Sequence, residues 1–131
     1  MVIDTSAIIA ILFAEAESAA MLAAIRLDEI RKIGAPTLVE SHAVMLAKKG
    51  KGGSVALDAL LERLAIEIEP FSNDAAEFAR RAYAKYGRGF GSPAVLNYGD
   101  CLSVGVAQAL GQPLLFKGDD FSKTVIDAVR Y

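Results

Sequence analysis

Acidic residues recur in this chain where a short apolar segment has just ended or where a late helix is about to begin. They are Asp4, Glu40, Asp100 and the adjacent pair Asp119 and Asp120. In an open parallel sheet, ligands bind in the crevice beyond the carboxyl ends of the strands, where chain segments leaving several strands meet. We therefore expect these acids to converge at one edge of a sheet, although they lie far apart in the sequence.

Converging carboxylates repel one another, and one or more would take up a proton at neutral pH unless a cation offsets their charge. Carboxylate oxygens without histidine or cysteine partners suit Mg²⁺, or Mn²⁺ in its place, and disfavour zinc. Such a site orients a water, lowers its pKa and stabilises the charge that builds on a phosphodiester during in-line displacement. The acids thus predict metal-dependent hydrolysis of a phosphodiester, by one metal ion or by two.

Most of these acids also have a structural interpretation. The segment Thr37–Glu40 matches a capping box, in which the glutamate satisfies a free backbone N–H, and Asn97–Asp100 has a similar pattern. Asp119 and Asp120 follow a glycine, as ordinary turn and cap residues do. Asp4, between a predicted strand and an apolar helix, has little local reason to be acidic. As a set, the acids favour a site.

The hydrophobic periodicity predicts strands that alternate with helices, and hence a mostly parallel sheet covered on both faces. Strands are expected at Val2–Ile3, Ile33–Ala35, Ile66–Ile68, Leu114–Phe116 and Val125–Val129. Helices are expected at 6–13, 15–28, 37–50, 54–64, 72–86 and 97–110. Two glycine-rich stretches, 50–53 and 87–92, are predicted loops, and the second is a candidate substrate-facing segment.

Composition bounds the size and setting of the protein. A chain of 131 residues, 53% of them hydrophobic, can bury roughly two-thirds of its unfolded surface in one compact domain, so we expect a single domain over residues 1–131. No apolar run approaches the roughly 20 residues of a membrane-spanning helix, and no secretory signal is readable. The single cysteine, Cys101, agrees with a reducing cytoplasm.

The net charge of −2 excludes a protein that holds a long nucleic acid by a global positive field. Any contact with nucleic acid must therefore be local. Two basic clusters are present, and most of their seven residues are interpreted as solvated helix faces. They are Lys48, Lys49 and Lys51 in one, and Arg80, Arg81, Lys85 and Arg88 in the other.

Three segments resemble a known family. Val2–Ala7 resembles the opening motif of PIN domains, which is common, whereas Asn97–Cys101 and Leu114–Phe121 resemble the more specific C-terminal signature of VapC-type toxins. With Glu40 at the expected place, the resemblance spans nearly the whole chain.

The resemblance implies a three-layer α/β/α PIN-like domain with a mostly parallel five-stranded sheet. It also implies a cytoplasmic magnesium-dependent endoribonuclease that acts as the toxin of a type II toxin–antitoxin pair. The implied partners are an RNA substrate, a cognate antitoxin whose basic segment fills the acidic crevice, and a second copy in a homodimer.

Position by position, the resemblance assigns catalysis to four acids, two of which would bind the metal directly. Asp120 is preferred to Asp119 as the fourth acid because the family pattern keeps the aspartate that precedes phenylalanine. The catalytic set is Asp4, Glu40, Asp100 and Asp120; the metal ligands are Asp4 and Asp100; the supporting residues are Thr5, Ser6, Asp119 and Thr124.

Four further positions matter less to the site. Val104 and Val125 stand where tyrosine and aspartate are common in the family, which bears on substrate preference rather than on the acids. His42, two positions after Glu40, is predicted to be structural or exposed, and Cys101 to be a small buried apolar residue.

Other classes fit less well. A phosphatase of the haloacid dehalogenase type needs a second acid two positions after the first, where this chain has Ser6, and a receiver domain needs paired acids near its start. The alternatives that stay open are a PIN nuclease for RNA processing or structured DNA, and a non-catalytic PIN-fold module for partner binding or dimerisation. Metal binding distinguishes that module from the enzymes.

Overall fold

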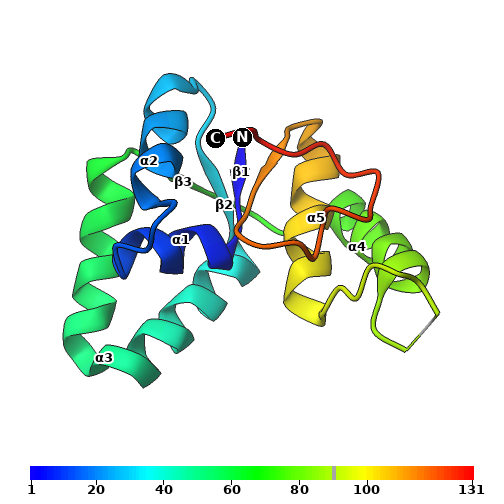
Figure 1. Cartoon of the computed structure of the whole chain (residues 1–131), viewed down its shortest axis with the longest axis horizontal. Helices are drawn as coiled ribbons and strands as arrows, with labels where there is room; N and C mark the ends of the chain where they lie inside the picture. The colour runs from blue at the N-terminus through cyan, green and yellow to red at the C-terminus, as the bar shows by residue number, and fades with distance from the viewer. Residues whose placement is uncertain (90) are drawn as a thin grey trace.

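The computed structural model describes residues 1–89 and 91–131, and its centre is a parallel sheet between two groups of helices (Figure 1). The strands within these residues are β1 (Val2–Ile3), β2 (Lys32–Gly34), β3 (Glu67–Glu69) and β4 (Leu114–Leu115), in the order β3-β2-β1-β4. Every pairing is parallel. All four carboxyl ends therefore face the same edge of the sheet, as the sequence predicts.

The predicted fifth strand at Val125–Val129 is wrong. Within the described residues, the sheet has four strands, and this segment makes only an isolated parallel bridge between Ala128 and Leu114. The C-terminal stretch thus meets β4 at one position and does not extend the sheet.

The helices form the two outer layers and confirm the three-layer α/β/α architecture. Helices α1 (Thr5–Leu12), α2 (Ser18–Leu27) and α3 (Ala35–Arg63) lie on one side, and α4 (Asn73–Tyr86) and α5 (Tyr98–Leu110) on the other (Figure 1). Because side chains alternate along a strand, β1 and β4 each serve both layers. Ile3 and Leu115 pack in the core with α1–α3, whereas Val2 and Leu114 pack in the core with α4 and α5.

Helix α3 corrects the predicted loop at 50–53. The chain bends at one residue, Gly50, whose φ of 61° and ψ of −153° are not helical, and helical structure resumes at once. Positive φ is accessible to glycine because it has no Cβ. A single glycine is thus sufficient to kink the helix, and the lysine and glycines that follow it are helical.

The two predicted capping boxes have opposite outcomes. At α5 the pattern is confirmed, because the side chain of Asn97 accepts from the Asp100 N–H while the Asp100 side chain accepts from the Asn97 N–H. At α3 it is wrong, because the helix has already begun at Ala35, with Gly34 as its N-cap. Thr37 and Glu40 therefore lie inside α3, and their side chains contact other elements.

The glycine-rich connection between α4 and α5 is irregular, as predicted, and its ends are joined by a parallel bridge between Gly87 and Leu96. Phe90, within the predicted substrate-facing segment, lies outside the described residues. No helix in the described part of the chain is long and apolar enough to cross a membrane.

Candidate active site

Asp4 stands at the carboxyl end of β1 and is the N-cap of α1. Its Oδ2 accepts hydrogen bonds from the Ser6 backbone N–H at 2.8 Å and the Ser6 hydroxyl at 2.7 Å. Its Oδ1 accepts from the hydroxyl of Ser103, on α5, at 2.7 Å. Asp4 is only 3% exposed, so these three donors replace the water that a buried carboxylate loses. Ser6 therefore has the supporting position that the sequence predicts.

Ser103 was not singled out from the sequence, although a signal existed. It lies three residues after Asp100 and hence on the same face of the helix, pointing toward the sheet. Its fully buried hydroxyl contacts Asp4 and lies 3.0 Å from the hydroxyl of Thr37, on α3. A buried polar chain thus connects α3, α5 and the end of β1.

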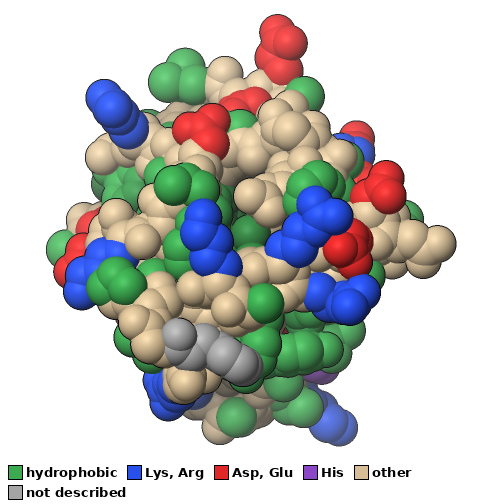
Figure 2. All heavy atoms as spheres, turned by 90° about the vertical axis from the view of Figure 1, so that its right-hand side faces the viewer, with side chains coloured by type: hydrophobic (Ala, Val, Ile, Leu, Met, Phe, Trp, Pro, Cys, Tyr) green, Lys and Arg blue, Asp and Glu red, His purple; other side chains and the backbone are tan. Residues whose placement is uncertain are grey.

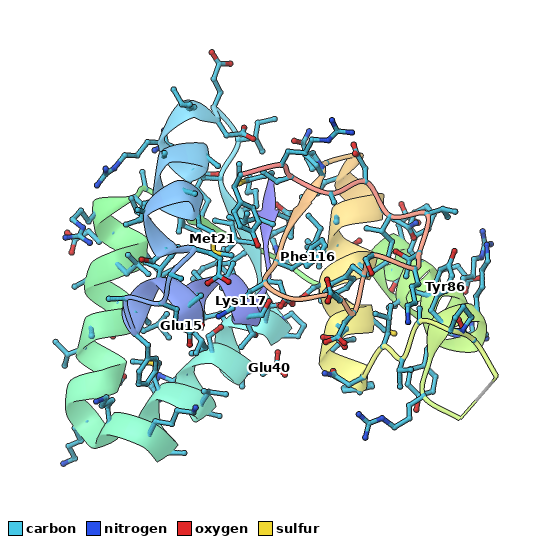
Figure 3. All side chains as sticks on the ribbon, viewed as in Figure 1. Glu15, Met21, Glu40, Tyr86, Phe116 and Lys117 are labelled. Carbon is cyan, nitrogen blue, oxygen red and sulfur yellow. The ribbon has the colours of Figure 1, made fainter. Side chains whose placement is uncertain are left out.

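Glu40 approaches the same edge from the first turns of α3 (Figure 3). The Thr5 hydroxyl donates to its Oε2 at 2.6 Å, and the Ser41 hydroxyl donates to Thr5 at 3.3 Å. On its other side the carboxylate faces Gly99 of α5, where a Cβ would lie 2.5 Å from Oε1. Glycine at this position permits the carboxylate of α3 to approach the backbone of α5.

Asp100 lies in the first turn of α5 and is partly buried. Burial raises the pKa of its carboxyl to about 6, against the lowering effect of a 2.6 Å hydrogen bond from the Asn97 N–H, and the charges of Asp4, Asp120 and Glu40 raise it further. Asp4, Glu40 and Asp120 are therefore each close enough to act on Asp100.

Asp119 and Asp120 are both exposed, but they differ in their relation to this group. The charge of Asp120 acts on Asp100, whereas Asp119 is not among the groups that shift the Asp100 pKa. Asp119 instead uses its backbone carbonyl to accept from Ser122. Thr124 is local as well: its hydroxyl donates to the Phe121 carbonyl at 2.7 Å, and none of its hydrogen bonds within the described residues reaches an acid of the group.

Lys117 is another contributor that sequence reasoning missed. Its backbone N–H donates to the Ser6 hydroxyl at 2.9 Å, which connects the end of β4 to the Asp4 cap. Its ammonium group turns toward the segment between α1 and α2, where it pairs with Glu15 and lies 3.2 Å from Glu17 (Figure 3). Hydrogen bonds to these two carboxylates raise the pKa of Lys117, so the ammonium group stays charged.

The donor chemistry of the acid group fits a hard divalent cation, because its members are carboxylates and the hydroxyls of Thr5, Ser6 and Ser103 bind two of them. The spacing is looser than a closed ligand set: in residues 1–89 and 91–131 no three acidic, histidine or cysteine side chains are grouped closely enough to hold an ion. The hydrogen bonds explain this spacing, since they hold Asp4, Glu40 and Asp100 against three different partners.

The remaining predictions on individual residues agree with the structure. His42 is exposed and contacts Ser54. Cys101 is 2% exposed, and burial raises its thiol pKa to about 11, which fits a small apolar residue better than a nucleophile. Val104 is buried in the core that α4 and α5 form with β1 and β4.

Comparison with known proteins decides the family. The PIN domain family model matches residues 1–126. VapC ribonuclease Mb0640 of Mycobacterium bovis is 44% identical over 129 residues, covering 98% of this chain and 98% of that protein. The chain belongs to the PIN-domain family and, within it, to the VapC proteins. Ribonuclease VapC28 of Mycobacterium tuberculosis is likewise 44% identical over 124 residues, covering 95% of this chain and 93% of that protein.

Solved structures share the fold of this VapC protein. VapC20 of Mycobacterium tuberculosis, described as a sarcin-ricin loop cleaving toxin, superposes with a TM-score of 0.77 at 17% identity, covering 99% of this chain and 98% of that one. A toxin–antitoxin complex from Klebsiella pneumoniae contains a chain that matches with a TM-score of 0.74 at 21% identity, with 99% and 97% covered. At 17% and 21% identity, the similarity to these structures shows a shared fold and nothing more.

Proposed function

We propose that this VapC protein is a magnesium-dependent endoribonuclease and the toxin of a toxin–antitoxin pair. The observation that carries the proposal is the acid group at the carboxyl edge of the sheet, in a chain 44% identical to VapC ribonucleases over nearly its whole length. The fold by itself is compatible with other activities. The support for this function therefore comes from the site and from the relatives, and not from the architecture.

Asp4 and Asp100 are the residues that would hold Mg²⁺, with Mn²⁺ as a substitute. When bound, the ion supplies an activated water and offsets the charge on the phosphodiester. The chain contributes a fixed carboxylate at Asp4, since three hydrogen bonds define its orientation. With a pKa of about 6, Asp100 is mostly ionised at neutral pH and therefore able to bind a cation.

Glu40 and Asp120 complete the proposed catalytic set. Thr5 orients Glu40 so that one carboxylate oxygen is occupied and the other faces the first turn of α5. A carboxylate in this position can accept a proton from the attacking water. Asp120, on the segment after β4, adds negative charge beside Asp100, which strengthens attraction for a cation.

The proposed macromolecular partners follow from charge and from relatives. An acidic crevice complements a basic segment of a cognate antitoxin, and solved relatives include VapBC2 of Rickettsia felis bound to a promoter DNA fragment. We also propose that the protein forms a homodimer and works in the cytoplasm on an RNA substrate.

The test is cleavage of a labelled mixed-sequence RNA by protein purified free of partners, with Mg²⁺, with EDTA, and with Asp4→Asn or Asp100→Asn. Asp58→Asn is the matched control, because Asp58 is an exposed aspartate of α3 outside the acid group. We expect cleavage by the parent and Asp58→Asn only with the metal, and a loss of roughly 10²- to 10³-fold in either site variant.

Two results would contradict the proposal. Cleavage that persists in EDTA would reject the metal, and it would remove the stated roles of Asp4 and Asp100. A parent that neither cleaves RNA or DNA nor binds Mg²⁺ would instead favour a non-catalytic partner-binding module.

A further inference from the structure

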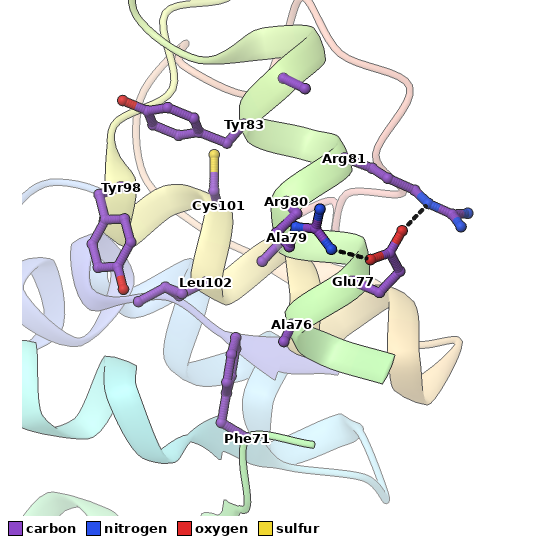
Figure 4. Close-up of a pocket in the computed structure, with 11 residues that line it drawn as sticks. Phe71, Ala76, Glu77, Ala79, Arg80, Arg81, Tyr83, Tyr98, Cys101 and Leu102 are labelled. Carbon is purple, nitrogen blue, oxygen red and sulfur yellow. Dashed lines mark hydrogen bonds and ion pairs between the residues drawn. The ribbon is translucent and has the colours of Figure 1, made fainter. Parts of the chain in front are cut away.

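A large groove lies between α4 and α5, next to the acid group but outside it (Figure 4). Its volume is about 890 Å³, within the range of roughly 300–1,000 Å³ that small-ligand sites occupy. The lining is mostly apolar, and its residues include Phe71, Ala76, Ala79, Tyr98 and Leu102. The groove is therefore large enough for a planar ring system and chemically suited to one.

The groove adjoins a second hollow that Glu40 of the acid group lines. This hollow of about 440 Å³ is lined by Val39, Glu40 and Gly99, and it shares Tyr98 and Leu102 with the larger groove. A ligand that extends from the Glu40 carboxylate into the larger groove must therefore pass Tyr98. Tyr98 therefore lies next to the place where the acids are proposed to cleave a phosphodiester bond.

Tyr98 is the first residue of α5 and is 72% exposed. In Figure 4 its ring lies along the same wall of the groove as Leu102, apart from the helix α4 that forms the other wall. Every nucleobase has a π-face, and stacking on an aromatic side chain is a common way to bind single-stranded nucleic acid without reading its sequence. An exposed ring between a carboxylate and an apolar groove has the geometry for such stacking.

The opposite wall carries positive charge. Arg80 and Arg81 line the groove from α4, and their side chains are 81% and 70% exposed. Both pair with Glu77, at 2.9 and 3.0 Å, so two guanidinium groups share one carboxylate (Figure 4). Exposed pairs of this kind contribute little and exchange readily. Figure 2 shows Lys and Arg side chains spread over the face of the molecule that carries this wall.

We propose that this groove is an RNA subsite, in which the base of a nucleotide adjoining the scissile phosphodiester stacks on Tyr98 and its backbone phosphate lies near Arg80. The inference rests on the proposed ribonuclease function and adds to it the residues that position the substrate. It also resolves a difficulty of charge: the acid group repels a polyanion, whereas the arginine wall attracts one.

A second copy of this chain is the competing occupant, since an apolar groove also suits a protein interface. The guanidinium wall and the adjoining hollow that Glu40 lines favour RNA, because both contribute to binding a strand that enters the acid group. The experiment therefore measures oligomeric state together with RNA cleavage.

The experiment is steady-state cleavage of a short labelled mixed-sequence single-stranded RNA with Mg²⁺, by the parent, Tyr98→Ala, Tyr98→Phe and Leu27→Ala. Leu27 is the matched control, an exposed apolar side chain at the end of α2 on the other side of the sheet. We expect Tyr98→Ala to raise KM roughly ten-fold, with little change in kcat. This factor lies in the lower half of the range expected for the loss of one base–aromatic stack. Tyr98→Phe and Leu27→Ala should keep the parent KM.

A substrate with a single abasic nucleotide beside the cleaved bond sharpens the test. If the base stacks on Tyr98, this substrate raises the parent KM by a similar factor, and Tyr98→Ala adds no further increase. Light scattering on each variant reports whether the mass of the particle changes.

The outcomes separate the two proposals. A parent that cleaves RNA, with a Tyr98→Ala variant of the same KM, overturns the subsite alone. A Tyr98→Ala variant that loses dimer mass while its KM stays at the parent value assigns the groove to a second copy. A parent that cleaves no RNA overturns the ribonuclease function first, and the subsite with it.

Discussion

Asp4 and Asp100 have the same side chain and lie close enough for the charge of one to act on the other, yet their surroundings differ sharply. Asp4 is almost completely buried, and three donors contact its two oxygens. Asp100 is more accessible but, among the described residues, has only the Asn97 N–H as a donor, and burial together with neighbouring acids raises its pKa to about 6.

The difference shows that the two aspartates have separate roles in the acid group. Donors from α1 and α5 compensate the charge of Asp4, so this carboxylate belongs to the framework that connects β1, α3 and α5. At Asp100, by contrast, burial and the charges of Asp4, Asp120 and Glu40 disfavour the ionised carboxylate and raise its pKa. Under the proposed function, a cation bound between the two aspartates would have Asp4 as a fixed ligand and would relieve the repulsion at Asp100.

The largest expected effect is that of Asp4→Ala. It removes the acceptor of three buried hydrogen bonds and leaves the Ser103 hydroxyl without its charged partner, so we expect the free energy of unfolding to fall by about 3 kcal/mol and cleavage to be lost. Urea unfolding and the cleavage assay measure both effects. Asp58→Ala is the control and should keep the parent stability; an equally stable Asp4→Ala would contradict the framework role.

Gly99→Ala perturbs the other side of the group with little effect on folding. A Cβ at this position would lie 2.5 Å from Glu40 Oε1, so the carboxylate must shift away from its hydrogen bond with Thr5. We expect the variant to fold with near-parent stability, while cleavage falls about 10- to 100-fold through misplacement of Glu40. Parent activity in this variant would show that the position of Glu40 is unimportant.

Ser103→Ala tests the buried chain that holds Asp4. In this variant the buried Oδ1 of Asp4 would lose its hydrogen-bond donor. We therefore expect the free energy of unfolding to fall by about 1–3 kcal/mol. Ser54→Ala is the matched control, since the Ser54 hydroxyl contacts only the exposed His42. A stability loss equal in the two variants would argue against a special role for Ser103.

The smallest effect is a pH dependence that belongs to Asp100. Its folded pKa of about 6 is above the ordinary value of 3.8, so the folded protein binds this proton more tightly than the unfolded chain does. The contribution of Asp100 to the stability of the metal-free protein should therefore decrease as pH rises from about 4 to about 6, and stay at the lower level above.

The variant Asp100→Asn checks this sign. It keeps an oxygen acceptor for the Asn97 N–H but carries no charge, so we expect it to flatten the pH dependence and to be more stable than the metal-free parent at neutral pH. Thermal unfolding across this pH range is the measurement. A variant less stable than the parent at neutral pH would mean that burial and the neighbouring charges do not destabilise the ionised form of Asp100.

The sequence predicts the alternation of strands and helices well, because apolar periodicity reports directly which faces are buried. It predicts the convergence of Asp4, Glu40 and Asp100 for a topological reason, since parallel strands present their carboxyl ends at one edge. The fifth strand was wrong because the segment at 125–129 makes only one isolated bridge, between Ala128 and Leu114, and such pairing depends on tertiary contacts rather than on the local apolar pattern.

The details of the site depend on contacts between elements that no local pattern encodes. Ser103 and Lys117 contact the Asp4 cap across 99 and 111 positions of the chain. The capping-box pattern of Thr37–Glu40 was misleading because α3 begins earlier, at Ala35, and its hydroxyl and carboxylate bind Ser103 and Thr5 instead.

The most direct test of the central claim, that Asp4 and Asp100 hold one cation between them, is titration of Mn²⁺ into the metal-free protein with the free ion followed by electron paramagnetic resonance. We predict that the parent and Asp58→Asn bind Mn²⁺ at neutral pH, that Mg²⁺ displaces it, and that Asp4→Asn and Asp100→Asn each lose this binding. Equal Mn²⁺ binding by the parent and both site variants would contradict the claim.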